Sequence, residues 1–158
     1  MNVVDKRVAF KGYPGREVLE RIVSRLGEEG LKDINSVIIL DTDVEASWHH
    51  GLTAKAVPLP GTDKIDIKIF YEGASMPQGL LASPIFNSYV YAKALLLEVY
   101  QHIALGKERK GGAESTLTVS AIEDWALADA QKMIRELYPP SEHKEEYGKL
   151  NKVLKSKR

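Results

Sequence analysis

The residues with the clearest chemical potential lie one helical turn apart in an apolar segment. Glu98 and His102 occur in the run LEVYQHI, which starts at Leu97, and residues four apart share one face of a helix. A carboxylate and an imidazole in this arrangement could contact one metal ion, or they could hydrogen-bond to each other. Three interpretations stay open: a plain helix-face pair, an altered metal site and a metal-free binding site.

Two further carboxylates stand at the start of a later helix. Glu123 and Asp124 follow Ser120, and the spacing Ser-x-x-Glu is typical of a capping box. Acidic side chains also suit the first turn of a helix, because the helix dipole favours negative charge there. Capping is the simpler role for both residues, and a place in the same groove as His102 is the alternative.

The adjacent histidines His49 and His50 lie in a polar turn. Neighbouring residues of an extended segment point in opposite directions, so these two cannot easily bind one ion together. One of them could join His102 if the turn folds over the helix, although a surface turn is the simpler expectation.

The order of the expected elements and the context of Glu98 resemble the small zincin metallopeptidases. That family places a helix first, then strands that include an edge strand, then a helix with HExxH in an apolar context. A third ligand, often Glu or Asp, comes from the next helix. Two imidazoles four residues apart reach one zinc ion, and the intervening Glu acts as general base. The resemblance covers roughly Gly15 to Leu137 and implies a zincin-like fold.

The motif differs from the family pattern at the metal ligands. With Glu98 aligned on the general base, the two ligand positions hold Leu97 and Gln101. With His102 aligned on the second ligand instead, Glu98 takes the first ligand position and Val99 takes that of the base. Either alignment lacks a part that the zinc mechanism needs, so the resemblance implies a degenerate motif, LEVYQH in place of HExxHH.

By the same resemblance, the segment Ile65–Tyr71 corresponds to the edge strand that pairs with an extended peptide in zincins. An exposed sheet edge offers backbone hydrogen bonds without side-chain chemistry, so this function could persist without zinc. An ordinary hairpin strand, guarded by Lys64 and Lys68, is the alternative. The expected peptide-binding groove contains Ile65, Ile67, Ile69, Glu98, Gln101 and His102.

Three functions follow from these residues. The leading expectation is a zincin-like domain with a decayed metal site that binds a peptide or protein segment, as a regulatory or binding module without a cofactor. The second is a metal-dependent hydrolase, peptidase-like, with Glu98 as catalytic residue and zinc or another divalent ion held by His102, Glu98 and Glu123 or Asp124. The third is nucleic-acid binding through the basic tail, the weakest because the formal net charge is +0.

The helices and strands that carry these residues can be predicted from hydrophobic periodicity and from the residues that begin and end helices. Alternation of period two predicts a half-buried strand over Ile65–Tyr71 and, with its predecessor, a hairpin. We expect an α+β fold with an N-terminal helix, a small, mostly antiparallel sheet with an edge hairpin, a long central helix and C-terminal helices. The predicted segments are a helix after Gly15 that ends at Gly27 or Gly30, strands at Val37–Leu40, Leu52–Leu59 and Ile65–Tyr71, and helices at Pro84–Leu105, Ser120–Leu137 and after Ser141.

Composition limits the remaining possibilities. The 158 residues predict one domain over 1–140, followed by a polar and basic helix or tail over 141–158. The chain has no cysteine, which excludes disulfides, thiolate metal sites and a cysteine nucleophile. It contains neither a glycine-rich phosphate loop nor a GxSxG motif. Without a long apolar run or a signal-peptide pattern, we expect a cytoplasmic protein and no membrane partner.

Overall fold

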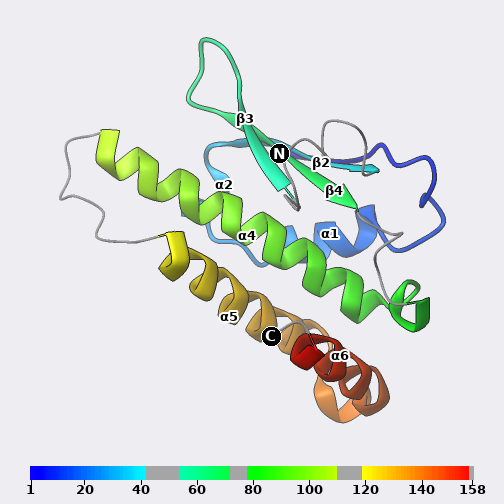
Figure 1. The fold of residues 1–158 in the computed structure, drawn as a ribbon. Coiled ribbons are helices and arrows are strands. Elements are labelled where there is room, and N and C mark those ends of the chain that lie inside the picture. Colours follow the sequence, from blue (N-terminus) through cyan, green and yellow to red (C-terminus); the bar gives the residue numbers. More distant parts are fainter. Residues whose placement is uncertain (42–53, 72–77, 110–118, 157–158) are drawn as a thin grey trace.

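The sheet has four strands in the order β1-β2-β4-β3, and the described helices lie on one side of it (Figure 1). The computed structural model describes residues 1–41, 54–71, 78–109 and 119–156, except for the side chains of residues 78, 106–109, 119–120 and 156. The α+β class predicted from the sequence is confirmed. The strands are β1 (Asn2–Asp5), β2 (Ile34–Asp41), β3 (Ala54–Pro58) and β4 (Ile65–Tyr71).

The sheet is mixed, so the expectation of a mostly antiparallel sheet is wrong. Two pairs, β1 with β2 and β2 with β4, are parallel, and only β3 with β4 is antiparallel. Helix α1 (Arg16–Val23) and the short α2 (Glu28–Leu31) connect β1 to β2. A helical crossover returns the chain to the same end of the sheet, which makes the two strands parallel. Strand β1 has four residues and was not predicted, because so short a segment shows no periodicity.

The predicted hairpin of β3 and β4 is confirmed, but the strand expected at the edge of the sheet is the inner one of the two. Strand β4 lies inside the sheet between β2 and β3, so Ile65–Tyr71 is not an edge strand. The edge on this side is β3. Gly61 in the connecting turn has φ 77°, a left-handed conformation that glycine adopts at little cost.

The alternation in β4 sorts its side chains as predicted. Ile67 and Ile69 have no exposed surface and face the helices, whereas Asp66 and Lys68 on the opposite face are partly exposed. Ile67 stands in one row with Val37 of β2, and the two belong to the main hydrophobic cluster. This row is the surface on which the long helix packs.

Helix α4 (Pro84–Arg109) forms the centre of the second layer. Ser83 caps it, because its Oγ accepts the Phe86 N–H at 3.2 Å, as the Ser-Pro pair predicted. The helix continues beyond Gly106, where it was expected to stop. One interior glycine costs only about 1 kcal/mol, which does not end a helix by itself.

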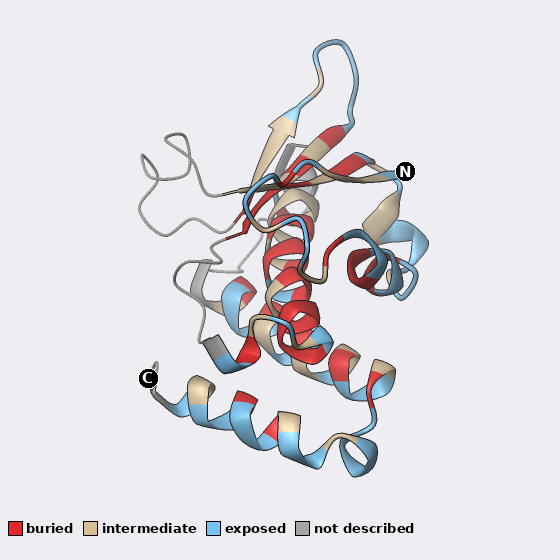
Figure 2. Ribbon diagram, turned by 90° about the vertical axis from the view of Figure 1, so that its right-hand side faces the viewer, coloured by how far each residue is buried: buried red, intermediate tan, exposed pale blue. Residues whose placement is uncertain are grey.

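Two C-terminal helices complete the layer. Helix α5 (Val119–Leu137) covers α4. A short 3₁₀ turn, η3 (Pro140–Glu142), leads from α5 to α6 (Lys144–Ser156), and another, η2 (Gln78–Leu80), precedes α4. Figure 2 shows buried residues along α4 and exposed residues on the outer sides of α5 and α6. A second hydrophobic cluster includes Tyr147 and Leu150 of α6. No described helix has the length and apolar character that a membrane span requires.

A buried arginine pairs with a partly exposed aspartate at the carboxyl end of β1. The side chain of Arg7 has no exposed surface, and its Nε and Nη2 donate to the two carboxylate oxygens of Asp5 at 3.0 and 2.9 Å. Nη2 also donates to the Tyr13 carbonyl at 2.7 Å, and the guanidinium lies 4.6 Å from the centre of the Tyr71 ring. Although burial alone would raise the pKa of Asp5, these Arg7 contacts lower it. A Cβ on Gly15 would lie 2.1 Å from Arg7 Nη2, so a larger residue there would require the ion pair to shift.

We expect Arg7→Ala to destabilise the protein by about 1–3 kcal/mol, because it leaves the partly buried Asp5 without its counter-charge and removes the hydrogen bond to the Tyr13 carbonyl. Arg16→Ala is the matched control, since it breaks an Arg–Glu pair of 2.7 Å whose partners are 65% and 48% exposed. Such surface pairs contribute about 0–1 kcal/mol. Urea unfolding of both variants measures the difference, and equal effects would contradict the structural role assigned to Arg7.

Candidate functional site

Glu98, Gln101 and His102 of the long helix α4 line a cavity of about 560 Å³. Its lining residues come from the second half of α4, the edge strand β3, the turn that joins β3 to β4 and the segment that follows α2. Its wall combines polar, charged and apolar side chains from four parts of the chain. The lining residues are Lys32, Asp33, Ala56, Pro58, Thr62, Asp63, Lys64, Ile65, Glu98, Gln101, His102 and Leu105.

Glu98 is the buried carboxyl of this cavity. The residue is 9% exposed, and burial raises its pKa from 4.5 to about 7, although a hydrogen bond from the backbone of Ala56 lowers it in part. An ionised carboxylate loses hydration when it is buried, which explains the direction of the shift. Near neutral pH the side chain therefore exists in both protonation states, as a hydrogen-bond donor or as an anion.

His102 pairs with a residue that lies far away in the sequence. Its Nε2 is 3.2 Å from Oδ2 of Asp33, which follows α2 and precedes β2. The two side chains are 23% and 33% exposed, so the pair lies at the mouth of the cavity. A carboxylate in this position orients the imidazole and leaves its other nitrogen for a different partner.

Among the described strands β3 pairs with β4 alone, so its other edge faces this cavity. Leu59 N–H donates to the Lys64 carbonyl at 2.9 Å, whereas Ile65 N–H donates to Asp33 on the side of β2. Backbone groups of an antiparallel strand alternate in direction, so those of Ala54, Ala56 and Pro58 point away from β4. The Ala56 N–H therefore faces outward, in agreement with its hydrogen bond to Glu98.

Four of the six residues expected in a peptide groove line the cavity: Ile65, Glu98, Gln101 and His102. The other two, Ile67 and Ile69, have no exposed surface and belong to the main hydrophobic core, so they cannot contact a ligand. The reason is the position of β4 inside the sheet. The strand that borders the cavity along its edge is β3.

The candidate metal ligands do not come together. Glu123 and Asp124 are exposed at the start of α5 and do not line the cavity. Over residues 1–41, 54–71, 78–109 and 119–156, no three His, Asp or Glu side chains are grouped so that they could hold a metal ion. The adjacent histidines His49 and His50, and the side chain of Ser120 in its expected capping box, lie outside the described residues.

The basic tail forms the exposed side of α6. Lys149, Lys152 and Lys155 are all exposed, and Lys149 Nζ lies 3.9 Å from Glu145 on the same helix. Tyr147 and Leu150 on the opposite side are buried. This amphipathic arrangement gives the lysines an ordinary solvated position. Lys157 and Arg158 lie outside the described residues.

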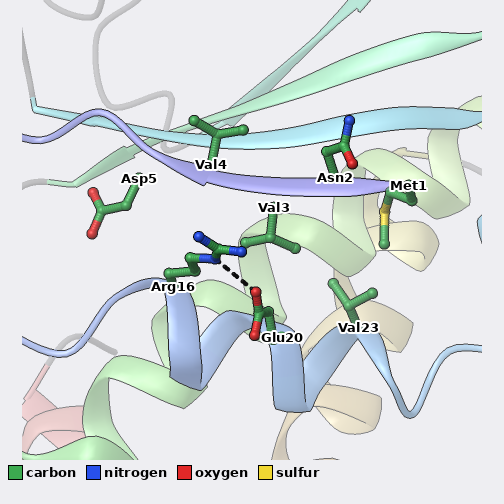
Figure 3. A pocket seen from close by; sticks show the side chains of 8 residues that line it. All are labelled: Met1, Asn2, Val3, Val4, Asp5, Arg16, Glu20 and Val23. Carbon is green, nitrogen blue, oxygen red and sulfur yellow. Dashed lines mark hydrogen bonds and ion pairs between the residues drawn. The ribbon is translucent and has the colours of Figure 1, made fainter.

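A second cavity, of about 630 Å³, opens between β1 and α1 (Figure 3). Val3 points down from the strand and Val23 points up from the helix, while Arg16 and Glu20 pair at its rim. The two charges on this helix neutralise each other. Asp5 in its wall is paired with Arg7 and has a lowered pKa, whereas Glu98 beside β3 is buried and has a raised pKa. The cavity beside β3 is therefore the stronger candidate.

Sequence reasoning missed the contributions of Asp33 and β3. Nothing local marks Asp33, which lies in a turn and reaches His102 only through the fold. Strand β3 did carry a signal, because its last residue is Pro58. Proline cannot donate to a neighbouring strand and is confined to strand ends and sheet edges, which indicates β3 rather than β4 as the edge.

Comparison of the chain with protein-family models, with curated proteins and with solved structures found no match.

We expect Glu98→Gln to stabilise the protein at alkaline pH and to have little effect below pH 4.5. A carboxyl with a raised pKa contributes its full stability in the protonated form and loses it as pH rises toward 7. The loss from 4.5 to about 7 corresponds to about 3 kcal/mol, which the neutral amide avoids. Glu17→Gln, an exposed acid on α1, is the control. Parallel pH curves for the wild type and Glu98→Gln would contradict the burial of an ionisable Glu98.

Proposed function

We propose that this chain is a peptide-binding domain with a zincin-like arrangement, in which an extended segment lies along the edge of β3 over the side chains of α4. The observation that carries the proposal is the outer edge of β3, which pairs with no other strand among the described residues and lies directly beside the cavity of Glu98, Gln101 and His102. An exposed sheet edge binds extended peptides through main-chain hydrogen bonds, and adjacent side-chain pockets add selectivity.

The wall of the cavity suits a main-chain ligand. Gln101 offers both a donor and an acceptor, and Glu98 offers either according to its protonation state. Leu105, which is 50% exposed, adds an apolar surface at the end of the cavity. A peptide presents the same combination of alternating amides and apolar side chains.

The resemblance to zincins supports the same site, although the strand must be reassigned. The family layout places an edge strand beside the helix that carries the motif. Here β3, rather than the expected Ile65–Tyr71, takes this place above α4. Glu98 keeps the position of the general base, while Leu97 and Gln101 replace the two zinc ligands. We therefore assign the site to binding rather than to metal-dependent hydrolysis.

We expect a mixture of short, unstructured tetrapeptides to bind at millimolar concentration or better, because a few main-chain hydrogen bonds contribute about 1 kcal/mol each. In ¹⁵N-labelled protein, the amide signals that move should be those of Ala54, Ala56 and the turn of α4 from Glu98 to His102. Shifts confined to α6, or no shifts at all, would contradict the proposal.

Two controls separate the competing functions. Replacing both Lys149 and Lys152 by alanine should leave the peptide-induced shifts unchanged, whereas a nucleic-acid-binding tail would show steeply salt-dependent binding that is lost in this variant. Zinc should give neither stoichiometric binding nor thermal stabilisation. Stoichiometric zinc that is lost on His102→Ala would overturn the proposal in favour of a metal-dependent hydrolase.

A further inference from the structure

Along its outer edge, β3 has more carbonyl oxygens than available amide N–H groups. The backbone groups of Ala54, Ala56 and Pro58 point away from β4, as the hydrogen bonds of Leu59 and Ile65 establish. Pro58 has no N–H, and the N–H of Ala56 is engaged by Glu98. Of these three residues, the two that line the cavity therefore present carbonyl oxygens without an available amide donor.

This imbalance disfavours the interior of a peptide. Each internal residue brings one N–H and one C=O to a neighbouring strand. Opposite Pro58, the C=O of an added residue would find no donor, and a buried carbonyl left unsatisfied costs about 1–3 kcal/mol. A ligand that begins opposite Ala56 avoids this cost, because it places no residue opposite Pro58.

The first residue of a peptide matches the edge in a second way. Its ammonium group, like that of lysine, has three donors and no acceptor. An added strand that runs antiparallel to β3 starts at the Pro58 end and continues toward Ala54, so its amino terminus falls at the cavity. Here the ammonium can donate to the Ala56 carbonyl and can pair with the Glu98 carboxylate, which releases the Ala56 N–H for the first carbonyl of the peptide.

The charges around this position favour a cation only moderately. Three carboxyl groups line the cavity, those of Asp33, Asp63 and Glu98, against two lysines, Lys32 and Lys64. Asp33 is also paired with His102. Recognition of an ammonium here therefore depends on the carbonyl of Ala56 and the carboxylate of Glu98 rather than on a general negative field.

We propose that the groove selects the free amino terminus of an extended peptide, with the first residue opposite Ala56 and the ammonium beside Glu98. This inference rests on the proposed function and adds the ligand class. The ammonium of a lysine side chain carries the same charge, but it arrives with an internal backbone that has to place a residue opposite Pro58.

Three synthetic peptides test the inference. They are Ala-Val-Thr-Val-amide with a free amino terminus, the same peptide with an acetylated terminus, and acetyl-Ala-Lys-Thr-Val-amide, which keeps an ammonium only on the side chain. Affinities come from titration of the amide signals of Ala56 and His102 at pH 7.5. We expect the free peptide to bind at least tenfold more tightly than either acetylated peptide.

A pair of variants identifies the group that recognises the amine. Glu98→Gln should reduce the preference for the free terminus by roughly tenfold, because it removes the counter-charge while it keeps the shape. Glu17→Gln should leave the preference unchanged, since this exposed acid lies on α1 outside the cavity.

The possible results separate the inference from the function on which it rests. Equal binding of the free and acetylated peptides, or tighter binding of either acetylated peptide, would overturn the selection of the amino terminus and would leave peptide binding at β3 in place. Failure of all three peptides to shift any signal of β3 or α4 would overturn both.

Discussion

The candidate site depends on one contact, between a carboxyl group of α4 and the edge of the sheet. Glu98 lies under β3 and accepts the outward N–H of Ala56, so one interaction ties the central helix to the strand that is outermost in the described sheet. Burying a carboxyl costs free energy unless it is protonated or hydrogen-bonded. The raised pKa of Glu98 shows that this cost is only partly offset, which is common at functional sites.

The position of that contact follows from the topology of the sheet. Helical connections make β1, β2 and β4 parallel, and the hairpin then adds β3 as an antiparallel strand at the edge. Because β4 is paired on both sides, its isoleucines form the core and leave the contact with a ligand to β3. Helix α4 crosses below, and its second half reaches the edge, where Glu98, Gln101 and His102 line the cavity. Asp33, at the start of β2, completes the wall by pairing with His102.

The sequence predicted the local structure more reliably than the neighbours of each strand. Alternation in Ile65–Tyr71 identified its buried face, because that pattern depends only on side-chain direction. The place of this strand within the sheet was wrong, since pairing depends on contacts with β2 that no local pattern encodes. Pro58 carried the missing information, because proline marks an edge. Helical spacing placed Glu98 and His102 on one face, the resemblance to zincins added Gln101, and all three line the cavity. Asp33 could not be predicted, because its contact with His102 joins segments 69 residues apart.

The edge of β3 holds the carboxyl of Glu98 between solvent and core, and the titration of this side chain tests that placement most directly. The chemical shift of the ¹³Cδ atom of Glu98 can be followed from pH 4 to pH 9 in the free protein, with Glu17 as an exposed reference in the same sample. If the carboxyl is buried in this way, its titration midpoint lies at about 7. A midpoint near 4.5, the ordinary value for glutamate, would show that the side chain is hydrated and would contradict the contact on which the site is built.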